Sequence, residues 1–409
     1  MKILIVSPYL PHPLCGHGGG VYLHKLIQHL SLKQEITLVS FCDEHELELV
    51  KDLAQLPFRI YPVRRAKGSQ RKTLARVGLS LHRMLQLASS IVRWEPYYVS
   101  KYRNSRMTRL IRELTRKESF DVVQVEFTQM GPYRTAIQSG KTLLQEIDVS
   151  FRPAYRRFKH TRSPIRKGIN YIEWCRWARY ETKIAGAFDH LLSVTDQDRM
   201  LLEWLTKKHH ISYLPLPTEA DEHLPDYDSR EALSLVFVGT FLHSPNVDAA
   251  IWLCEKIFPL VSKEFPEAKL YVIGPHPPAA LSTIASRQPG IHILGFVEDV
   301  DSYLRRGSVF VAPLRFGGGV KTKILNALAH GIPVVTTKIG IEGIEGIDSN
   351  NILVAESPEK FADAVRSLFA DSSRASALGL RGWELVKQKY SWGQAVSCLE
   401  DIYQRVLNP

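Results

Sequence analysis

The chain has 409 residues, of which 44% are hydrophobic, 23% charged and 10% aromatic, and this composition is that of a globular protein with a large buried core. Its five cysteines are odd in number, far apart and form no CxxC pair, which excludes a disulfide framework and a zinc site and favours a reducing compartment. The formal net charge is +11.

The positive charge is concentrated in two segments. Fifteen Lys or Arg stand against two acidic residues between Arg64 and Lys117, and a second basic cluster runs from Arg152 to Lys167. The N-terminal half is therefore expected to prefer an anionic partner. The first residues, "MKILIVSPYLPHPL", are too short and too broken by proline for a signal peptide, and no apolar run approaches the ~20 residues of a membrane-spanning helix.

Short, continuously apolar runs alternate with helical patterns through both halves, which predicts parallel strands joined by crossover helices. Continuous apolar character predicts sheets covered on both faces, and hence an α/β fold of two doubly wound Rossmann-like domains facing across a cleft. The predicted strands are residues 2–7, 35–41, 58–63, 121–127, 142–148, 190–195 and 211–215 in the first half, and residues 233–239, 268–274, 291–297, 309–314, 333–337 and 352–356 in the second.

A segment rich in proline and acidic residues, "LPLPTEADEHLPDYDSREA", separates the two halves at residues 214–232. This composition is typical of an interdomain linker. The predicted domains are residues 1–216 and 217–392, and the amphipathic helix at 393–409 is expected to pack back onto the first domain.

The segment "LRFGGGVKTKILNALAHGIPVVTT" follows the predicted strand that ends at Leu314, and its helix is expected to begin near Val320. Glycines at a helix start let the backbone approach an anion, and the helix dipole favours negative charge there. Arg315, Lys321 and Lys323 add positive charge, and GxxxxGK[ST] of the Walker A loop is absent. The alternative is that the glycines serve turn geometry and the lysines are solvated.

Four fragments, "FVGTFLHSPNVDAAIWLCEKIFP", "GFVEDVDSYL", "VAPLRFGGGVKTKILNALAHGIPVVTT" and "YSW", occur in this order between Leu233 and Trp392. In order and spacing they resemble the donor-binding domain of GT-B glycosyltransferases, most closely retaining family 4 in its branch with "PLR-x-GGG" before the helix. The resemblance implies a nucleoside diphosphate sugar as donor, with its diphosphate over the glycine loop and its base near the backbone of residues 296–298.

The donor-binding residues implied are Gly18, Gly19, Gly20, Gly239, Phe296, Val297, Arg315, Gly317, Gly318, Gly319, Val320, Lys321, Thr322 and Asn326. In many relatives two glutamates seven residues apart flank the loop, one touching the donor sugar and the other the ribose. Here these positions hold Gly318 and Asn326. A neutral amide makes weaker hydrogen bonds to a ribose diol than a carboxylate does.

The segment "GHGGGV" joins the first strand to a helix expected near Gly20. In GT-B relatives a glycine-rich loop at this place faces the donor phosphates. Two alternatives stay open. One is a dinucleotide-binding loop, with Gly16 and Gly18 in GxGxxG and Asp43 as the acid, although Val21 stands at the third glycine position. The other is a flexible loop with no ligand.

Three residues are candidates for catalysis. Glu126 and Asp148 follow predicted strands and could orient an acceptor hydroxyl or act as a base, or else they are loop caps or surface carboxylates. His243 follows the strand at 233–239 and could reach the donor sugar or its phosphate. Asn246 in the same loop is expected to cap the next helix.

No metal site is predicted, because the Asp-x-Asp pairs at 196–198, 226–228 and 299–301 are interpreted as helix caps and solvated acids. No cofactor is expected besides the nucleoside diphosphate sugar, which is a substrate, because amides and lysines can stabilise the leaving group. Residues 64–117 could contact an anionic membrane surface, or form a soluble helix pair with a solvated basic face. Nucleic acid is not expected, since no recognition motif accompanies the charge.

The sequence therefore predicts a cytoplasmic glycosyltransferase, with peripheral contact at the inner face of a membrane as an open alternative. It would move a sugar, with retention, to a glycan or lipid-linked acceptor in glycan, polysaccharide or glycolipid synthesis. Two alternatives remain, a catalytically inactive partner or sensor protein and a nucleotide-sugar epimerase.

Overall fold

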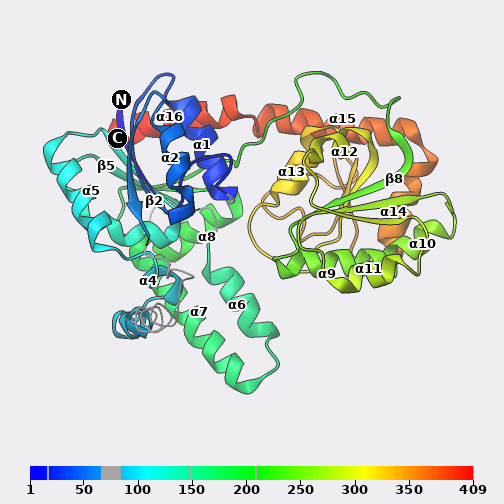
Figure 1. Cartoon of the computed structure of the whole chain (residues 1–409), viewed down its shortest axis with the longest axis horizontal. Coiled ribbons are helices and arrows are strands. Elements are labelled where there is room, and N and C mark those ends of the chain that lie inside the picture. The colour runs from blue at the N-terminus through cyan, green and yellow to red at the C-terminus, as the bar shows by residue number, and fades with distance from the viewer. Residues whose placement is uncertain (16–17, 66–83, 147–148, 208–209, 409) are drawn as a thin grey trace. The chain divides into compact units, whose positions relative to one another are not determined.

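The computed structural model describes residues 1–15, 18–65, 84–146, 149–207 and 210–408 (Figure 1). The chain divides into two compact units, Met1–Leu214 with Val396–Pro409, and Pro215–Ala395. The division between Leu214 and Pro215 lies next to the boundary predicted near Pro217.

Unit 1 contains a sheet of seven parallel strands in the order β3-β2-β1-β4-β5-β6-β7. The strands are β1 (Lys2–Ser7), β2 (Glu35–Cys42), β3 (Arg59–Arg64), β4 (Val122–Glu126), β5 (Lys141–Glu146), β6 (His190–Ser193) and β7 (Ile211–Tyr213). The helices are α1 (Gly18–Leu30), α2 (Leu47–Leu53), α4 (Tyr97–Ser100), α5 (Ser105–Lys117), α6 (Phe151–His160), α7 (Pro164–Ala185) and α8 (Asp196–Thr206), with 3₁₀ turns η1 (Glu44–Glu46) and η2 (Thr128–Ala136). Residues 84–93 are also helical.

Unit 2 contains a sheet of six parallel strands in the order β10-β9-β8-β11-β12-β13. The strands are β8 (Glu231–Val238), β9 (Lys269–Ile273), β10 (Ile291–Gly295), β11 (Gly307–Ala312), β12 (Val334–Thr336) and β13 (Leu353–Val354). The helices are α9 (Ser244–Trp252), α10 (Phe258–Ser262), α11 (Ala279–Ala285), α12 (Val300–Arg306), α13 (Thr322–Ala329), α14 (Pro358–Ala370) and α15 (Ser372–Lys389), and the π-helical turn η3 (Leu253–Ile257) connects α9 to α10.

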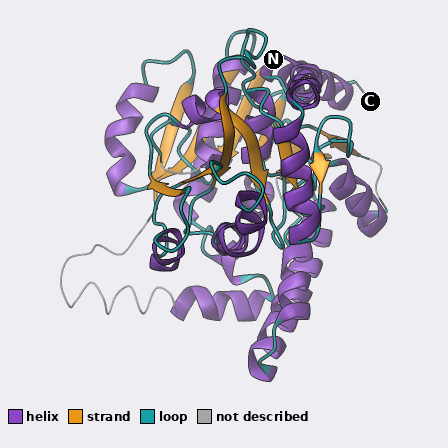
Figure 2. Ribbon diagram, turned by 90° about the vertical axis from the view of Figure 1, so that its right-hand side faces the viewer, coloured by secondary structure: helices purple, strands orange, loops and turns teal. Residues whose placement is uncertain are grey.

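Helices cover both faces of the strands, as Figure 2 shows. In unit 2 successive side chains of β8 enter different cores: Leu235 and Phe237 pack with α9, α10 and α14, whereas Val236 packs with α12, α13 and α15. Both faces of a strand must be apolar when both are covered, which explains the continuous apolar runs. The predicted fold class of two Rossmann-like parallel-sheet domains is confirmed.

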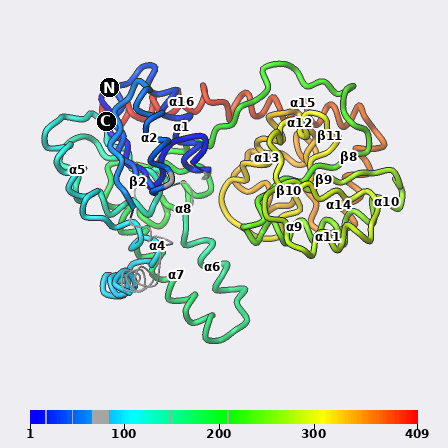
Figure 3. Tube along the Cα trace, viewed as in Figure 1, coloured from blue at the N-terminus to red at the C-terminus, as the bar shows by residue number. Residues whose placement is uncertain are grey.

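The last helix, α16 (Trp392–Leu407), begins in unit 2, and its residues from Val396 belong to unit 1. Within unit 1 the two chain termini lie side by side (Figure 3), and Lys33 and Gln34 each donate a hydrogen bond to Glu400 of this helix. Tyr403 is fully buried and its hydroxyl donates to Gln124 of β4. The C-terminal helix therefore completes the core of unit 1.

Candidate functional site

The carboxyl ends of four neighbouring strands of unit 2 bring together the loops in which donor-binding residues were predicted. Gly239 follows β8, and its amide N–H donates to Ile273 of β9. Gly274 follows β9, has φ +148°, and donates to Gly295 at the end of β10. The loops after β8, β9 and β10 are thus joined by backbone hydrogen bonds, beside the loop that follows β11.

The loop after β11 depends on glycine for its backbone conformation. Gly317 and Gly319 have φ of +133° and +67°, values that side chains with a Cβ rarely adopt. The Lys321 ammonium donates to the carbonyl oxygens of Gly318 at 3.1 Å and Gly319 at 2.5 Å. The helix α13 begins at Thr322, with Lys321 as its N-cap, so the predicted start near Val320 is wrong by two residues.

A second lysine, Lys323, lies in the first turn of α13. The Lys323 ammonium donates to the side-chain oxygen of Asn246 at 2.5 Å and lies 5.1 Å from the centre of the Phe237 ring. Asn246 in turn donates to the carbonyl oxygen of Thr240 at 2.8 Å. The prediction that Asn246 caps α9 is wrong, because His243 is the N-cap residue and the Asn246 side chain connects β8's loop to α13.

This arrangement requires glycine at position 239. A Cβ atom there would lie 2.8 Å from both the Lys323 nitrogen and the Asn246 side-chain carbon. Burial, together with the smaller effect of the neighbouring Lys321 charge, lowers the pKa of the Lys323 ammonium to about 7. A desolvated ammonium with one side-chain hydrogen bond is a strong potential donor to an anion.

Arg315 does not offer an unpaired charge to the loop. Its guanidinium makes two hydrogen bonds to the Asp248 carboxylate, at 2.9 Å and 2.5 Å, and lies 5.1 Å from the Trp252 ring. The pKa of Arg315 is raised chiefly by the hydrogen bonds that it donates to the Asp248 carboxylate. A bidentate pair of this kind fixes the guanidinium plane.

Asn326 is exposed, and its side-chain oxygen accepts a hydrogen bond of 2.6 Å from the Thr218 hydroxyl. Gly318, at the other position where relatives carry glutamate, is also exposed. The remaining predicted residues lie at the same edge of the sheet: Phe296 is 72% exposed directly after β10, Val297 packs partly against the core, and the His243 side chain is exposed. Their roles stay predictions.

In unit 1 the glycines predicted to face donor phosphates form the first turn of α1, which begins at Gly18 and not near Gly20. A Cβ on Gly19 would lie 2.5 Å from the Phe127 ring, and one on Gly20 would lie 2.5 Å from the carbonyl oxygen of Leu10. Close packing therefore explains glycine at 19 and 20. Around Gly18 no atom lies within 4 Å of the added Cβ.

Glu126 ends β4, as its position in the sequence indicated, but its side chain is fully buried. Gln124 donates to the Glu126 carboxylate at 2.5 Å and accepts a hydrogen bond from Tyr403. Burial raises the pKa of Glu126 to about 7. Asp148, the other carboxylate candidate, lies outside the described residues.

Sequence reasoning passed over a second buried carboxylate, Glu146, which ends β5. Both of its oxygens are buried without a hydrogen bond among the described residues, and burial, with the nearby charge of Asp198, raises its pKa to about 8. The signal was present, since Glu146 lies two residues before Asp148 in the same predicted strand, 142–148. The Asp-x-Asp pairs have structural roles: Asp299 caps α12, and Asp226 accepts from the backbone of Asp228.

The fold and the loops of unit 2 define a class of protein, that of the GT-B fold. The structure resembles sucrose-phosphate synthase from Thermosynechococcus elongatus with a TM-score of 0.70 and 14% identity over all of both chains. It resembles HepE from Anabaena in complex with UDP, with a TM-score of 0.65 and 10% identity over 99% of this chain and 100% of the other. WaaG, a glycosyltransferase involved in lipopolysaccharide biosynthesis, gives a TM-score of 0.62 and 13% identity over 98% and 99%.

Residues 232–371, within unit 2, match the family model of the glycosyl transferases group 1, and the matched segment includes the glycine loop. A relative from Klebsiella pneumoniae, described as an uncharacterized 44.6 kDa protein in the cps region, is 23% identical over 251 residues. The match covers 58% of this chain and 62% of the relative.

The lowered pKa of Lys323 makes a prediction about stability. The folded-state value of about 7 lies below the ordinary 10.5 of a lysine, so between these values the unfolded chain binds more protons than the folded one. Stability should therefore rise with pH above about 7, by up to about 1.4 kcal/mol per pH unit relative to Lys323→Met. Urea unfolding of both proteins at pH 7, 8 and 9 measures this difference, with Lys263→Met at an exposed site as the control. A difference for Lys323→Met that does not change with pH would contradict the desolvated ammonium.

The packing of α1 makes a second prediction. Gly20→Ala should lower the free energy of unfolding by about 1–3 kcal/mol, because the new methyl group meets the Leu10 carbonyl and the Cys15 sulfur. Gly18→Ala, in the same turn but in open space, should change it by less than about 0.5 kcal/mol. Equal losses from both variants, measured by urea unfolding, would mean that the helix start and not the contact sets the requirement.

Proposed function

We propose that this protein is a glycosyltransferase that moves a sugar from a nucleoside diphosphate sugar to an acceptor hydroxyl. One observation carries the proposal: within the family-matched domain, a glycine loop, the start of α13 and two lysines meet at the carboxyl edge of the sheet. In open parallel sheets ligands bind at this edge, and backbone N–H groups at a helix start favour phosphate.

In this proposal Gly317, Gly318 and Gly319 hold the diphosphate with Lys321. To reach a phosphate oxygen, the Lys321 ammonium would exchange its bonds to the loop carbonyls for bonds to the anion. Lys323 would add positive charge next to the loop, because an anion nearby would favour its protonated form. The exposed Phe296 and the backbone that follows it would lie against the base.

Retention at the anomeric carbon, and the family 4 branch with "PLR-x-GGG", are part of the proposal. Catalysis would come from donor positioning and from amides and lysines that stabilise charge on the leaving diphosphate. His243 is proposed to reach the donor. Glu126 and Asp148 are proposed to act on the acceptor hydroxyl; Glu126 would have to gain access to it, because its side chain is enclosed.

The acceptor is proposed to be a glycan or a lipid-linked glycan bound by unit 1, in polysaccharide or glycolipid synthesis. Support comes from the relative in a cps region and from the likeness to a glycosyltransferase of lipopolysaccharide biosynthesis. A cytoplasmic location is part of this proposal.

The predicted contact of residues 64–117 with a membrane surface depends on which apolar side chains this segment exposes. Residues 66–83 lie outside the described part of the chain. In α5 the apolar residues Met107, Ile111 and Leu114 are buried in the core, so this helix presents only its basic face. For α5, a soluble helix with a solvated basic face therefore describes the structure better than a helix whose apolar face is inserted into a membrane.

A second candidate is a glycosyltransferase-like protein that binds donor without transferring sugar. Gly318 and Asn326 favour it, because neither position offers a carboxylate and the Asn326 oxygen already accepts from Thr218.

Calorimetry with UDP, GDP, ADP and dTDP, followed by product analysis with the corresponding sugar nucleotides, tests the proposal. Binding of one nucleoside diphosphate and transfer or hydrolysis of its sugar is expected. Binding without turnover would favour the inactive protein, interconversion of the donor without acceptor would favour an epimerase, and no binding would reject a donor site.

Lys321→Ala should weaken nucleoside diphosphate binding by about tenfold or more, because a charge-assisted hydrogen bond to phosphate is lost. Binding of the nucleoside alone should change by less than about twofold. Lys263→Ala removes the same charge from an exposed position on α10's end and is the control. If calorimetry finds equal losses for both ligands with Lys321→Ala, the loop does not hold the diphosphate.

Asn326→Glu should tighten donor binding by about fivefold, since a carboxylate accepts stronger hydrogen bonds from a ribose diol than an amide does. Asn326→Gln adds the same length without charge and should not tighten binding. The same calorimetric titration compares the three proteins. An unchanged affinity for Asn326→Glu would place the ribose elsewhere.

A further inference from the structure

The helices α6 and α7 form a hairpin between β5 and β6 of unit 1, and its outer part extends away from the sheet (Figure 1). Of α6 only Ala154 is buried, and the buried residues of α7 begin at Trp177, with the partly buried Trp174 packed against the core just before them. Residues 155–175, called the distal hairpin below, therefore add little to the core of unit 1.

The distal hairpin is nevertheless held rigid by its own side chains. The rings of Tyr155, Phe158, Tyr171 and Trp174 contact one another across the two helices, with centroids 5.0–6.2 Å apart. Lys167 lies 5.6 Å from the centre of the Phe158 ring. A small aromatic core of this kind maintains a structure that the rest of the unit does not require.

The outer surface of the distal hairpin combines exposed apolar side chains with positive charge. Ile165, Ile169 and Ile172 are 79%, 61% and 43% exposed, and their spacing of four and three residues places them on one face of α7. Six Lys or Arg stand against one acidic residue, Glu173, between positions 155 and 175. Exposed isoleucines in a row are unfavourable in water, which indicates that something covers them.

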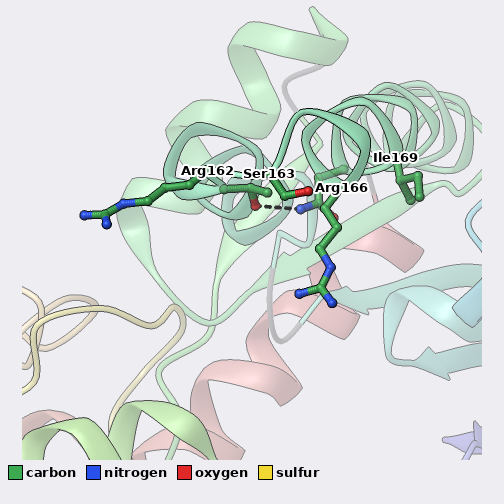
Figure 4. Close-up of a pocket in the computed structure, with 6 residues that line it drawn as sticks. Arg162, Ser163, Arg166 and Ile169 are labelled. Carbon is green, nitrogen blue, oxygen red and sulfur yellow. Dashed lines mark hydrogen bonds between the residues drawn. The ribbon is translucent and has the colours of Figure 1, made fainter.

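A pocket of about 500 Å³ lies at the turn between the two helices (Figure 4). Its lining residues are Thr161, Arg162, Ser163, Arg166, Ile169 and Asn170. The Arg162 and Arg166 side chains extend from this turn, and Asn170 donates to the Thr161 hydroxyl at 2.8 Å. The Arg162 and Arg166 side chains point in different directions (Figure 4), so each guanidinium offers its own hydrogen bonds to a phosphate, and Ile169 adds an apolar side chain beside them.

We propose that the distal hairpin docks on the surface of an anionic phospholipid membrane, with the isoleucine row among the acyl chains and Arg162 and Arg166 against headgroup phosphates. Exposed apolar side chains flanked by Lys and Arg suit a membrane interface, because the apolar groups leave water while the charges meet anionic headgroups. The chain does not span the bilayer through any described helix, since none combines the length and apolar character needed.

Charge favours this occupant over the others. A second copy of the hairpin would bring two positive surfaces together, and nucleic acid would leave the isoleucine row in water. A neighbouring surface strengthens the choice: in helical residues 84–93, Leu85, Ile91 and Val92 are each more than half exposed. This segment is connected to α7 through Trp94, whose ring lies 4.9 Å from the Arg176 guanidinium.

The test uses the full chain without nucleotide, so its result does not depend on the proposed glycosyltransferase activity. Flotation with phosphatidylcholine vesicles containing increasing phosphatidylglycerol should show binding that rises with the anionic fraction and falls with salt. Arg162→Ala with Arg166→Ala should lower the partition coefficient by about fivefold for each arginine. Ile165→Ser with Ile169→Ser should also lower it, and should weaken the binding that remains at high salt.

The matched control is Arg109→Ala with Arg112→Ala, which removes the same charge from exposed positions of α5. It should retain most of the binding, and unchanged unfolding midpoints would show that all the variants fold. Absence of binding to anionic vesicles, or an equal loss from the α5 pair, overturns the proposal. The proposal is also overturned if Ile165→Ser with Ile169→Ser changes the oligomeric state of the protein but leaves its binding to vesicles unchanged. Binding of inorganic phosphate that requires Arg162 and Arg166, with vesicle binding unaffected, would assign the pocket to a soluble phosphate and also overturn it.

Discussion

The desolvated ammonium of Lys323 is the interaction on which the candidate site of unit 2 depends. Its ammonium lies against Phe237 of β8, Gly239 in the loop that follows β8, and Asn246 in the first turn of α9. A charged group taken out of water is costly unless it is hydrogen-bonded, and here one amide oxygen and one ring face replace the water. The lysine therefore fixes the start of α13, and with it the glycine loop, against the end of β8.

The cations around the glycine loop already have partners within the protein. In the structure Arg315 is paired with Asp248, Lys321 binds the loop carbonyls, and Lys323 binds Asn246. An anion that enters must offer these groups better partners than they already have, so its net affinity is the difference between two sets of hydrogen bonds. Backbone N–H groups carry no such cost when they face solvent. The glycine loop is thus expected to contribute more to net binding than the number of nearby cations indicates.

The fold could be predicted from the sequence because the strands are buried on both faces. Each strand of the two described sheets overlaps a predicted apolar run, although β8 and β11 begin two residues before theirs, and a continuous apolar run can be recognised without knowledge of the strand's neighbours. Positions near loops were less accurate. The predicted start of α13 was two residues early, at a segment where the Lys321 ammonium donates to a glycine carbonyl oxygen. The role of Asn246 was predicted wrongly because its partner, Lys323, lies 77 residues away in the sequence. Such long-range pairs leave no local signal, whereas a cap or an apolar run does.

In the distal hairpin and the residues next to it, the number of basic residues in the sequence does not predict which of them pair with a carboxylate. The cluster from Arg152 to Lys167 was visible as positive charge, but Arg152 is paired with Asp198 at 2.7 Å near the body of unit 1, whereas Arg162 and Arg166 lie at an exposed turn. The same residue type thus has a structural role at one end of the helix pair and is available to a ligand at the other. What separates the two is burial, because the buried residues of α7 begin at Trp177. A basic segment becomes an interaction surface only where the fold leaves its charges without carboxylates and its apolar side chains without a core.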